Sequence, residues 1–418
     1  MGSRGPEKSL RATNYFLEGK DVKMKMMKKL SSVALAAMVL AALTAGCGGG
    51  GAKKDADKAA GNEIVVGASF ELTGNVANYG KSTLSGFQMA IDEANKAGGV
   101  NGKKIRIVQS DNKSEPAESG NAVTKVVTQD KVVAVVGPAT SGCVAAAEPV
   151  VTGAKVPLIA PCATAPGITV NKDGSVKQFI FRACFIDPFQ GKVMATFADK
   201  TLHVKNVAIL FDSSSDYSKG LAEVFQKTLE ANGGKVVAKE AFLAKDIDFK
   251  SALTKLKASN PEAIYVPGYY EEVSKIVKQA REIGLNVPML GSDGWDSPKL
   301  AEIAGPAALN NCYFSSAFSS DDKDPGVQKF IKTYKDTNKK DPDVFAMQGY
   351  NAGLVLVNAL KTAGTTDGTK LAAALAATKD LSVASGKFTY DKDHNPITGA
   401  IVIAMKDGKQ TFKEKINL

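Results

Sequence analysis

The chain has 418 residues, of which 44% are hydrophobic and 23% are charged, a globular composition with enough length for about two domains. Half of the formal net charge of +10 comes from the N-terminus, because residues 1–46 hold eight basic and three acidic side chains and leave 45 basic against 40 acidic in the remainder. So small an excess, without a basic stripe that carries interleaved aromatic residues, excludes nucleic acid from the expected partners.

The N-terminal segment is typical of an export leader. A basic stretch, KMKMMKK, precedes a mostly apolar run of 14 residues, LSSVALAAMVLAAL, which is shorter than the ~20 residues of a membrane-spanning helix. The run ends in LTAGC, which resembles the bacterial lipobox and implies cleavage before Cys47 and attachment of lipid to its thiol. We therefore expect a leader and signal peptide over 1–46, a lipidated and flexible tether over 47–61, and an extracytoplasmic protein anchored to a membrane.

A possible phosphate-binding loop follows the first strand-like run, EIVVGASF. The stretch TGNVANYGKST lies where a nucleotide-hydrolysing protein holds its phosphates, in a loop with four residues between two glycines and then Lys and Ser/Thr in register. Gly74 and Gly80 have five residues between them, so Lys81 is one position out of register. The stretch therefore predicts a polar turn before a helix, not a site for ATP.

Short β-branched runs alternate with amphipathic helical stretches along the rest of the chain. One such helix is predicted over 81–97, where apolar residues share one face before two glycines end it. This alternation indicates βαβ units in parallel sheets, and the number of units favours two doubly wound α/β domains. Near the C-terminus two strand runs meet at Asp407–Gly408, a hairpin signal. The expected parallel strands lie in EIVVGASF, KIRIVQS, KVVAVVGP, VPLIAP, NVAILFD, AIYVPG and VPMLGS.

Hydroxyl side chains follow two successive predicted strands. VVAVVGPATSG leads through Thr140 and Ser141 into a helix, and VPLIAPCATAPG places Thr164 before another helix start. Ligands of open α/β sheets bind beyond the carboxyl ends of the strands, so both ends should meet at one crevice. Each hydroxyl alone is expected to cap a helix, whereas two together, with free helix amides, favour a site for a carboxylate.

The second half of the chain offers an acid and aromatic side chains at strand ends. Asp293 follows VPMLGS, where an Asp is either a helix cap, a turn residue or the partner of a cation. Tyr217 and Tyr269 follow other strands and either pack in the core or line a pocket. Hydroxyls, an acid and aromatic walls together predict a site for a free amino acid with an apolar side chain.

No pattern for catalysis or metal binding accompanies this site. The chain has no GxSxG elbow, no HExxH and no GxGxxG after a strand, so we expect neither an enzyme nor a cofactor. The remaining cysteines form no CxxC or zinc pattern, and their pairing stays open: Cys143, Cys162, Cys184 and Cys312. The two histidines are far apart in the chain, and solvated or capping roles are expected for both: His203 and His394.

Over residues 62–418 the chain resembles the leucine/isoleucine/valine-binding periplasmic proteins, the substrate-binding subunits of branched-chain amino-acid ABC transporters. The resemblance implies a type I periplasmic binding fold, a Venus-flytrap clamp with three crossovers, with domains over 62–183 plus 317–391 and 184–316 plus 392–418. It also implies that the loaded protein, a monomer, docks on a membrane permease. The segments that carry it are GASFELTGNVANYGKSTLSGFQMAIDEANKAGGVNGKKI, VVGPATSG, VPLIAPCATAPGIT, FRACFIDPFQG, DSSSDYSKGLAEVF, DFKSALTKLK, YVPGYYEEVSKIVKQAREIGL and LGSDGWDSP.

The resemblance also assigns ligand contacts residue by residue. The hydroxyls that bind the carboxylate fall on Ser141 and Thr164, with Cys162 and Ala163 beside them. The partner of the ammonium group falls on Asp293, next to Gly294, where leucine-binding members have Glu. The pocket aromatics fall on four residues, of which the first is expected to be a wall or lid at the cleft rim: Tyr79, Tyr217, Tyr269 and Phe345.

Three departures from the family pattern leave the cargo open. Asp293 is one methylene shorter than Glu, Trp295 is expected next to the pocket, and the positions of the family's first-domain disulfide hold Ser114 and Thr140. An aromatic amino acid, an amide or a urea-like solute is therefore an alternative cargo. A sensor of such ligands is the alternative to a transport protein.

Overall fold

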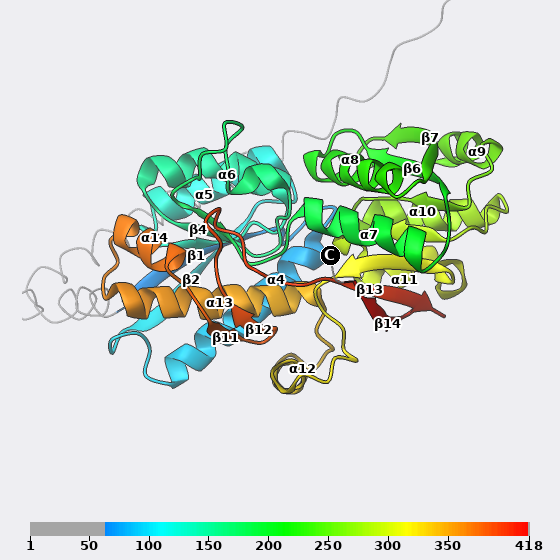
Figure 1. Cartoon of the computed structure of the whole chain (residues 1–418). Coiled ribbons are helices and arrows are strands. Elements are labelled where there is room, and N and C mark those ends of the chain that lie inside the picture. Colours follow the sequence, from blue (N-terminus) through cyan, green and yellow to red (C-terminus); the bar gives the residue numbers. More distant parts are fainter. Residues whose placement is uncertain (1–62, 417–418) are drawn as a thin grey trace, which may run out of the picture. The chain divides into compact units, whose positions relative to one another are not determined.

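The structure is a computed structural model, and it describes residues 63–416. The expected leader, Cys47 and the tether lie outside the described residues. Residues 63–416 form two α/β lobes, each built around its own mainly parallel sheet (Figure 1). We call the lobe with the five-stranded sheet the first lobe and the lobe with the seven-stranded sheet the second lobe. The fold class expected from the sequence is confirmed, whereas the domain boundaries given above stay a prediction.

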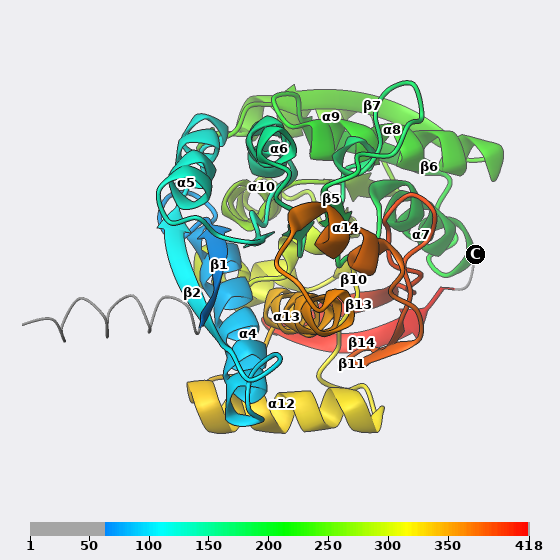
Figure 2. The same cartoon turned by 90° about the vertical axis from the view of Figure 1, so that its left-hand side faces the viewer.

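The first lobe is a doubly wound sheet with five parallel strands in the order β2-β1-β3-β4-β5. Successive residues of a strand point to opposite faces, so Val66 packs under α4, α13 and α14 while Val65 faces α5 and α6 (Figure 2). The strands are β1 (Glu63–Phe70), β2 (Lys104–Asp111), β3 (Val135–Val136), β4 (Leu158–Ala160) and β5 (Ile180–Arg182). The helices are α4 (Ala77–Lys96), α5 (Pro116–Thr128), α6 (Ser141–Ala154), η1 (Pro166–Ile168), α12 (Pro325–Asn338), α13 (Val344–Ala363) and α14 (Gly368–Ala376). A small antiparallel pair joins them, β11 (Leu381–Val383) and β12 (Gly386–Phe388).

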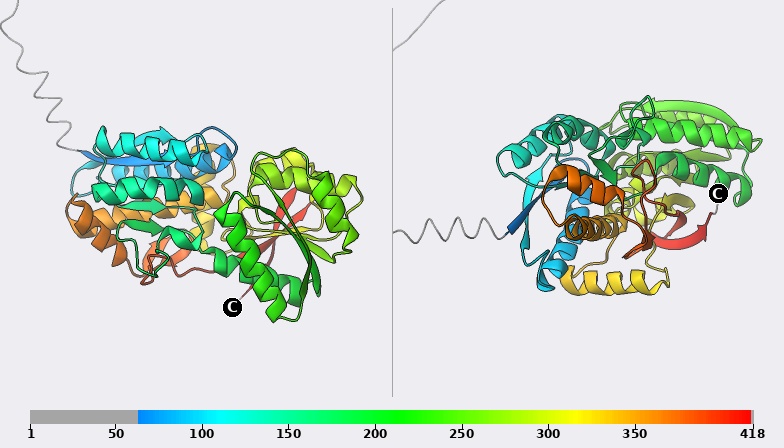
Figure 3. Two further views of the ribbon diagram at one scale, coloured as in Figure 1. Left: turned by 90° about the horizontal axis from the view of Figure 1, so that it is seen from above. Right: turned by 60° about the vertical axis from the view of Figure 1, so that its left-hand side comes forward.

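The second lobe has a sheet with strands in the order β14-β13-β10-β9-β8-β6-β7 (Figure 3). In it β13 runs antiparallel to β10 and β14 runs antiparallel to β13, whereas the other neighbouring strands are parallel. The expected hairpin is confirmed, because Asp407 and Gly408 form a two-residue turn with positive φ between β13 and β14. The strands are β6 (Asn206–Asp212), β7 (Lys235–Phe242), β8 (Ala263–Tyr265), β9 (Met289–Gly291), β10 (Cys312–Ser316), β13 (Ile401–Lys406) and β14 (Lys409–Lys415). One face is covered by α7 (Asp187–Lys200) and α8 (Asp216–Ala231). The other is covered by α9 (Lys250–Ala258), α10 (Tyr270–Glu282), α11 (Pro298–Ala304) and η3 (Pro306–Leu309), while η2 (Asp293–Trp295) follows β9.

The chain crosses between the lobes three times, after β5, after β10 and before β13. His394 holds the third crossover against the first lobe, because its ring stacks on Phe181 with centroids 4.1 Å apart and its Nδ1 lies 2.9 Å from the carbonyl oxygen of Ile180. Burial lowers the pKa of this imidazole. The expectation of a solvated or capping His394 is therefore wrong. Between residues 63 and 416, no helix combines the length and the apolar character needed to cross a bilayer.

Two predicted elements have different bounds. The helix expected over 81–97 begins at Ala77, so Tyr79 and Gly80 lie inside its first turn. Glycine is needed there, because a Cβ on Gly80 would overlap with the backbone of Glu71. Of the run KVVAVVGP, only Val135–Val136 pairs as a strand. The sequence pattern thus predicted the position of both elements, but neither where the helix begins nor how long the strand is.

The helices α4 and α13 pack with their backbones in contact, as they lie side by side in Figure 1. A Cβ on Gly349 of α13 would overlap with the carbonyl oxygen of Thr83 on α4, and Gly86 makes an equally close approach to α13. Only glycine permits such an approach at these positions. Tyr79 and Phe345 lie in the first turns of these two helices, so the packing sets the distance between their rings.

We predict that Gly349→Ala lowers the free energy of unfolding by about 1–3 kcal/mol, because backbone atoms of Thr83 cannot move aside without shifting a helix. Urea denaturation measures this loss. Gly220→Ala is the matched control, since Gly220 lies inside α8 with nothing within 4 Å of an added Cβ. Alanine should leave that helix unchanged or stabilise it by up to about 1 kcal/mol. Equal stability of Gly349→Ala and wild type would contradict the close packing.

Candidate ligand-binding site

A pocket lies between the two lobes, beyond the carboxyl ends of β3, β4, β6, β8 and β9. The pocket and its mouth together enclose about 250 Å³ of space that protein atoms do not fill. Nine of the ten residues predicted from the sequence line it, and Ala163 does not. The lining residues are Tyr79, Ala139, Thr140, Ser141, Cys162, Thr164, Tyr217, Tyr269, Asp293, Gly294 and Phe345.

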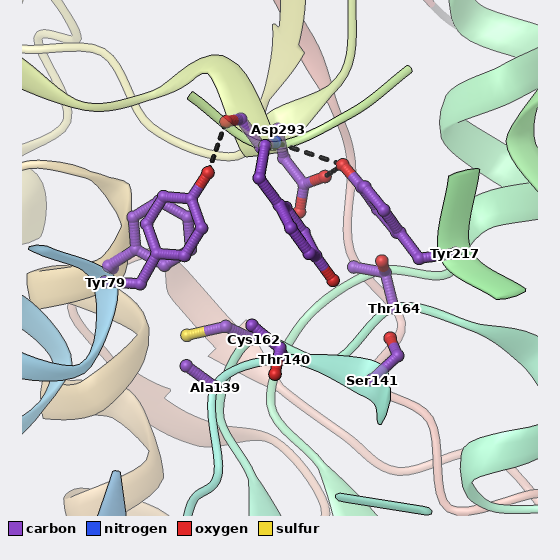
Figure 4. Close-up of a pocket in the computed structure, with 11 residues that line it drawn as sticks. Tyr79, Ala139, Thr140, Ser141, Cys162, Thr164, Tyr217 and Asp293 are labelled. Carbon is purple, nitrogen blue, oxygen red and sulfur yellow. Dashed lines mark hydrogen bonds between the residues drawn. The ribbon is translucent and has the colours of Figure 1, made fainter. Parts of the chain in front are cut away.

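The first lobe contributes hydroxyl groups and a helix N-terminus to the pocket. Ser141 is the first residue of α6, whose first-turn amides have no partner within the helix. Its Oγ accepts a hydrogen bond from the backbone N–H of Ala165 at 3.2 Å, which ties the start of α6 to the loop that carries Thr164. Figure 4 shows Ser141 and Thr164 on the side of the pocket opposite Asp293. Hydroxyls and helix amides at one wall make that wall suited to an anion.

The loop before Ser141 is held by Glu71, a buried acid that follows β1. Its carboxylate accepts hydrogen bonds from the backbone N–H groups of Ala139 and Thr140, both at 3.0 Å, and from the Thr140 hydroxyl at 2.8 Å. Thr140 lines the pocket, but its hydroxyl is committed to Glu71. Ser141 and Thr164 are the other two hydroxyls on this wall, and the Thr164 hydroxyl also lies close enough to Asp187 to lower the pKa of that acid. Sequence reasoning did not single out Glu71.

The second lobe contributes Asp293, the first residue of η2. Its Oδ1 accepts hydrogen bonds from the Tyr217 hydroxyl at 2.6 Å and from Gln190 Nε2 at 3.0 Å. Burial raises the pKa of this carboxyl to about 6, although both hydrogen bonds oppose the shift. The same Tyr217 hydroxyl accepts a hydrogen bond from the N–H of Gly294 at 3.1 Å, so η2 and its acid are fixed in place.

A second acid, Asp187, stands next to Asp293 and was not predicted. It is the first residue of α7, and its Oδ1 accepts a hydrogen bond from Gln190 Nε2 at 2.9 Å, while its buried Oδ2 has no hydrogen-bond partner among the described residues. Burial raises the pKa of Asp187 to about 7; the nearby Thr164 hydroxyl lowers it and the charge of Asp293 raises it further. One side-chain amide thus bridges two buried carboxyls, an arrangement that attracts a cation. In the sequence, an Asp before Pro188 has the form of an ordinary helix start.

Aromatic rings form the walls between the hydroxyls and the acids. Tyr79 stacks on Phe345 with centroids 4.2 Å apart and meets Tyr269 edge-on at 5.8 Å, and Tyr269 stacks on Tyr217 at 5.1 Å. The expectation that Trp295 lies next to the pocket is wrong. Its indole is buried in the core of the second lobe.

Tyr79 also connects the two lobes. Its hydroxyl donates a hydrogen bond to the carbonyl oxygen of Gly294 and accepts one from the N–H of Tyr270 at 3.1 Å. With 1% of its surface exposed, Tyr79 is a buried bridge rather than a residue of an open rim. In the state described here, the lobes are closed over the pocket at this point.

Further contacts between the lobes lie outside the pocket. The Oε1 atom of Glu272, on α10, accepts hydrogen bonds from Asn75 Nδ2 at 2.8 Å and from the N–H of Lys245 at 2.9 Å. Lys245 in turn forms an ion pair with Glu115 of the first lobe. These contacts do not involve the pocket lining, so closure has a component that is independent of the ligand.

The four cysteines between residues 63 and 416 are all free and buried, so the family's first-domain disulfide is absent from this part of the chain. No group of three or more His, Cys, Asp or Glu side chains between residues 63 and 416 is placed to hold a metal ion. Cys162 lines the pocket, and burial raises the pKa of its thiol well above the ordinary value, as does the nearby Cys184. Its thiol is therefore neutral and lies 3.5 Å from the hydroxyl of Thr83.

Known proteins resemble this chain in sequence and in structure. A family model described as periplasmic binding protein matches residues 63–410. The branched-chain amino acid transporter substrate-binding protein LivJ of Streptococcus pneumoniae, solved in complex with isoleucine, is 40% identical with a TM-score of 0.80, and the match covers 85% of this chain and 99% of LivJ. The Leu/Ile/Val-binding protein BraC3 of Rhizobium johnstonii is 32% identical over 329 residues, or 78% of this chain and 87% of BraC3. An ABC transporter solute-binding protein of R. palustris, solved with benzoate, is 25% identical with a TM-score of 0.77, over 84% of this chain and 96% of its own.

Two α/β lobes that close on a pocket at their strand ends define a solute-binding protein of the two-lobed class. The chain belongs to the periplasmic binding protein family, over nearly all of the residues that the structure describes. The resemblance to the leucine/isoleucine/valine-binding proteins is confirmed by these relatives. Since the family and the named relatives are binding proteins, the expectation that the chain is not an enzyme is also confirmed.

We predict that the stability cost of ionising Asp187 appears as a pH dependence of the ligand-free protein. The folded pKa of about 7 exceeds the unfolded value of ~3.9, so the stabilisation is complete below about pH 4 and is lost as the pH rises through about 7. Asp187→Asn cannot ionise, and it should therefore gain roughly 1–3 kcal/mol relative to wild type between pH 5 and pH 8. Urea denaturation at the two pH values measures the difference.

Asp173→Asn serves as the control for this pH dependence, because Asp173 is exposed and Ser175 lowers the pKa of its carboxyl. Both the folded and the unfolded form of Asp173 are then ionised at pH 5 and pH 8, and the stability difference from wild type should be equal at the two values. A constant difference for Asp187→Asn would contradict a raised pKa at that site.

Proposed function

We propose that this protein binds a free amino acid with an apolar side chain, of the branched-chain kind, and delivers it to the permease of an ABC transporter. The observation that carries the proposal is the polarity of the pocket: hydroxyls and helix amides at the first lobe face the buried carboxyl of Asp293 across an aromatic space (Figure 4). Asp187 lies behind the lining, joined to Asp293 through the amide of Gln190. An α-amino acid presents a carboxylate and an ammonium group at one end and an apolar group at the other. Isoleucine is the ligand bound to the relative LivJ, which supports this class of cargo.

The proposed orientation follows from the charges. The carboxylate contacts the hydroxyls of Ser141 and Thr164 and the free amides at the start of α6. The ammonium group lies between Asp293 and Asp187, where its charge favours the ionised form of both acids and lowers their raised pKa values. The apolar side chain packs against Tyr79 and other aromatic walls, with Cys162 and Gly294 as smaller surfaces.

The proposal places the protein outside the cytoplasm, as a lipid-anchored monomer. Its support is the leader pattern with Cys47 after LTAGC in the sequence, together with membership of the periplasmic binding protein family. Loading of the pocket and closure of the lobes then precede docking on the permease. A sensor would bind its ligand in the same pocket and would differ only in its membrane partner, a receptor in place of the permease.

A second candidate cargo is an aromatic carboxylate, because aromatic rings line the pocket and a relative was solved with benzoate. Such a ligand would satisfy Ser141 and Thr164 but would bring no cation to Asp187 and Asp293. Both acids would then stay buried without a counter-charge, which is costly. An amide or urea-like solute would leave the carboxylate-binding wall without its partner. The pocket therefore favours the amino acid.

We predict that leucine, isoleucine and valine raise the melting temperature of the purified protein in a panel of all amino acids plus benzoate and urea. A ligand at about 100 times its dissociation constant adds about 2.7 kcal/mol of stability, enough for a shift of a few degrees. Thermal denaturation followed by fluorescence or calorimetry measures the shift. A shift with benzoate alone would favour the second candidate, and no shift with any amino acid would contradict the proposal.

We predict that Asp293→Ala weakens amino-acid binding by about 2–5 kcal/mol, because the ammonium group loses a buried partner when the lobes close. Isothermal titration calorimetry with the amino acid selected by the panel measures the loss. Asp216→Ala is the control, since Asp216 is an exposed acid of the same lobe, next to Tyr217 in the chain. The affinity of this variant for the amino acid should equal that of the wild type. Unchanged affinity in Asp293→Ala would remove Asp293 from the site.

A further inference from the structure

Arg182, the last residue of β5, is the one buried cationic side chain among residues 63–416, and within this part of the chain it forms no salt bridge. Its guanidinium donates to the backbone instead, from Nη1 to the carbonyl oxygen of Ala163 at 3.1 Å and from Nη2 to that of Ala165 at 2.9 Å. Weaker contacts reach the carbonyl oxygen of Pro166 and the hydroxyl of Thr169. Burial lowers the pKa of Arg182, but a guanidinium stays protonated at neutral pH.

A buried guanidinium without an acidic partner needs compensation from other groups, because its desolvation is expensive. The nearby charges of Asp187 and Asp391 supply part of this compensation by raising the pKa of Arg182. The hydrogen bonds come from the loop that follows β4, the same loop that brings Cys162 and Thr164 to the pocket. Hydrogen bonds from a charged donor are stronger than those between neutral groups. Arg182 therefore holds this loop in one conformation from the side that faces away from the ligand.

The consequence for Thr164 follows from the geometry of the peptide bond. In a planar trans peptide the C=O and the N–H point in opposite directions, so the Ala163 carbonyl turned to Arg182 directs the N–H of Thr164 away from Arg182. The next peptide is fixed on both sides, because the carbonyl of Thr164 accepts from the N–H of Asp187 at 3.0 Å while the N–H of Ala165 donates to Ser141 Oγ. The carbonyl of Ala165, in the peptide after that, accepts from Arg182. The two hydroxyls of the carboxylate-binding wall are thus linked through a loop that Arg182 organises.

We propose that Arg182 is a positioning residue for the ligand's carboxylate: it turns the loop carbonyls away from the pocket, presents the N–H and hydroxyl of Thr164 to the ligand, and places a buried positive charge behind them. The inference rests on the proposed function and deepens it. Carbonyl oxygens turned into the pocket would repel a carboxylate, whereas oriented amides and a cation behind them attract one.

The first crossover gives the site its polarity under this proposal. Arg182 lies at its first-lobe end, and Asp187, five residues later, lies at its second-lobe end with Gln190. One short segment therefore supplies the cation behind the carboxylate-binding wall and an acid for the ammonium group. A ligand bound in the reverse orientation would place its ammonium group towards Arg182 and its carboxylate towards two acids.

Arg182→Met tests the proposal through ligand preference. Titration calorimetry compares leucine with leucinamide, which keeps the ammonium group and replaces the carboxylate by a neutral amide. The wild-type preference for leucine should fall by about tenfold or more in the variant, because interactions with the carboxylate are lost selectively. A merely structural role would weaken both ligands equally and leave the preference unchanged. If Arg182→Met does not fold, Arg182→Lys replaces it, since one ammonium group cannot serve the same set of carbonyls and the preference should still fall.

Arg281 offers a matched control. It also donates to backbone carbonyls, those of Leu285, Val287, Ala308 and Asn310, but it lies in α10 and is not part of the pocket lining. Arg281→Met should lower the melting temperature and leave the ratio of leucine to leucinamide affinity at the wild-type value. If the wild type binds leucine but the ratio of leucine to leucinamide affinity is unchanged in the Arg182 variant, the inference about Arg182 is overturned and the proposed function stands. Absence of amino-acid binding by the wild type would overturn the proposed function, and the inference with it.

Discussion

The burial of two carboxyls beside each other is the constraint on which the pocket depends. Asp293 and Asp187 share the amide of Gln190, and desolvation raises the pKa of both. Without a cation in the pocket, the closed lobes favour protonation of these acids. An ammonium group would let both stay ionised while the lobes are closed, so the charge of the ligand is coupled to closure. Under the proposed function, the ammonium group of the ligand supplies this positive charge.

Closure also has contacts that do not depend on the ligand. Tyr79 bridges to Gly294 and Tyr270, and Glu272 joins Asn75 of the other lobe. A ligand can shift an equilibrium between open and closed lobes only by its difference in affinity for the two. Contacts between the lobes reduce the difference that the ligand must supply. The balance between these contacts and the desolvation of the acids would then determine how far an empty protein closes.

Much of the fold and part of the pocket could be predicted from local patterns in the sequence, and the resemblance to the leucine/isoleucine/valine-binding proteins added Tyr79, Cys162 and Phe345. Alternating strands and helices indicated two parallel sheets, and the rule that ligands bind at carboxyl ends of strands selected Ser141, Thr164 and Asp293. The pattern could not show which side chains are buried. Asp187 has the sequence form of a helix start, and Trp295 after a strand could face either the pocket or the core. Arg182 gave no signal, because its partners are carbonyls, which every residue carries.

The exchange of Glu for Asp at position 293 has a structural answer in this chain. A shorter acid would either draw the ligand towards the second lobe or require a water, if it acted alone. Asp187 stands beside it on the same lobe, with a buried oxygen that has no hydrogen-bond partner among the described residues, and Gln190 fixes both acids through one amide. Two short acids can then hold one ammonium group where a single longer acid would reach it. The stacked rings of Tyr79 and Phe345 stay in place, since α4 and α13 are packed too closely to shift. Under the proposed function, the shorter side chain would therefore change how the ammonium group is held more than which ligand side chain the aromatic walls admit.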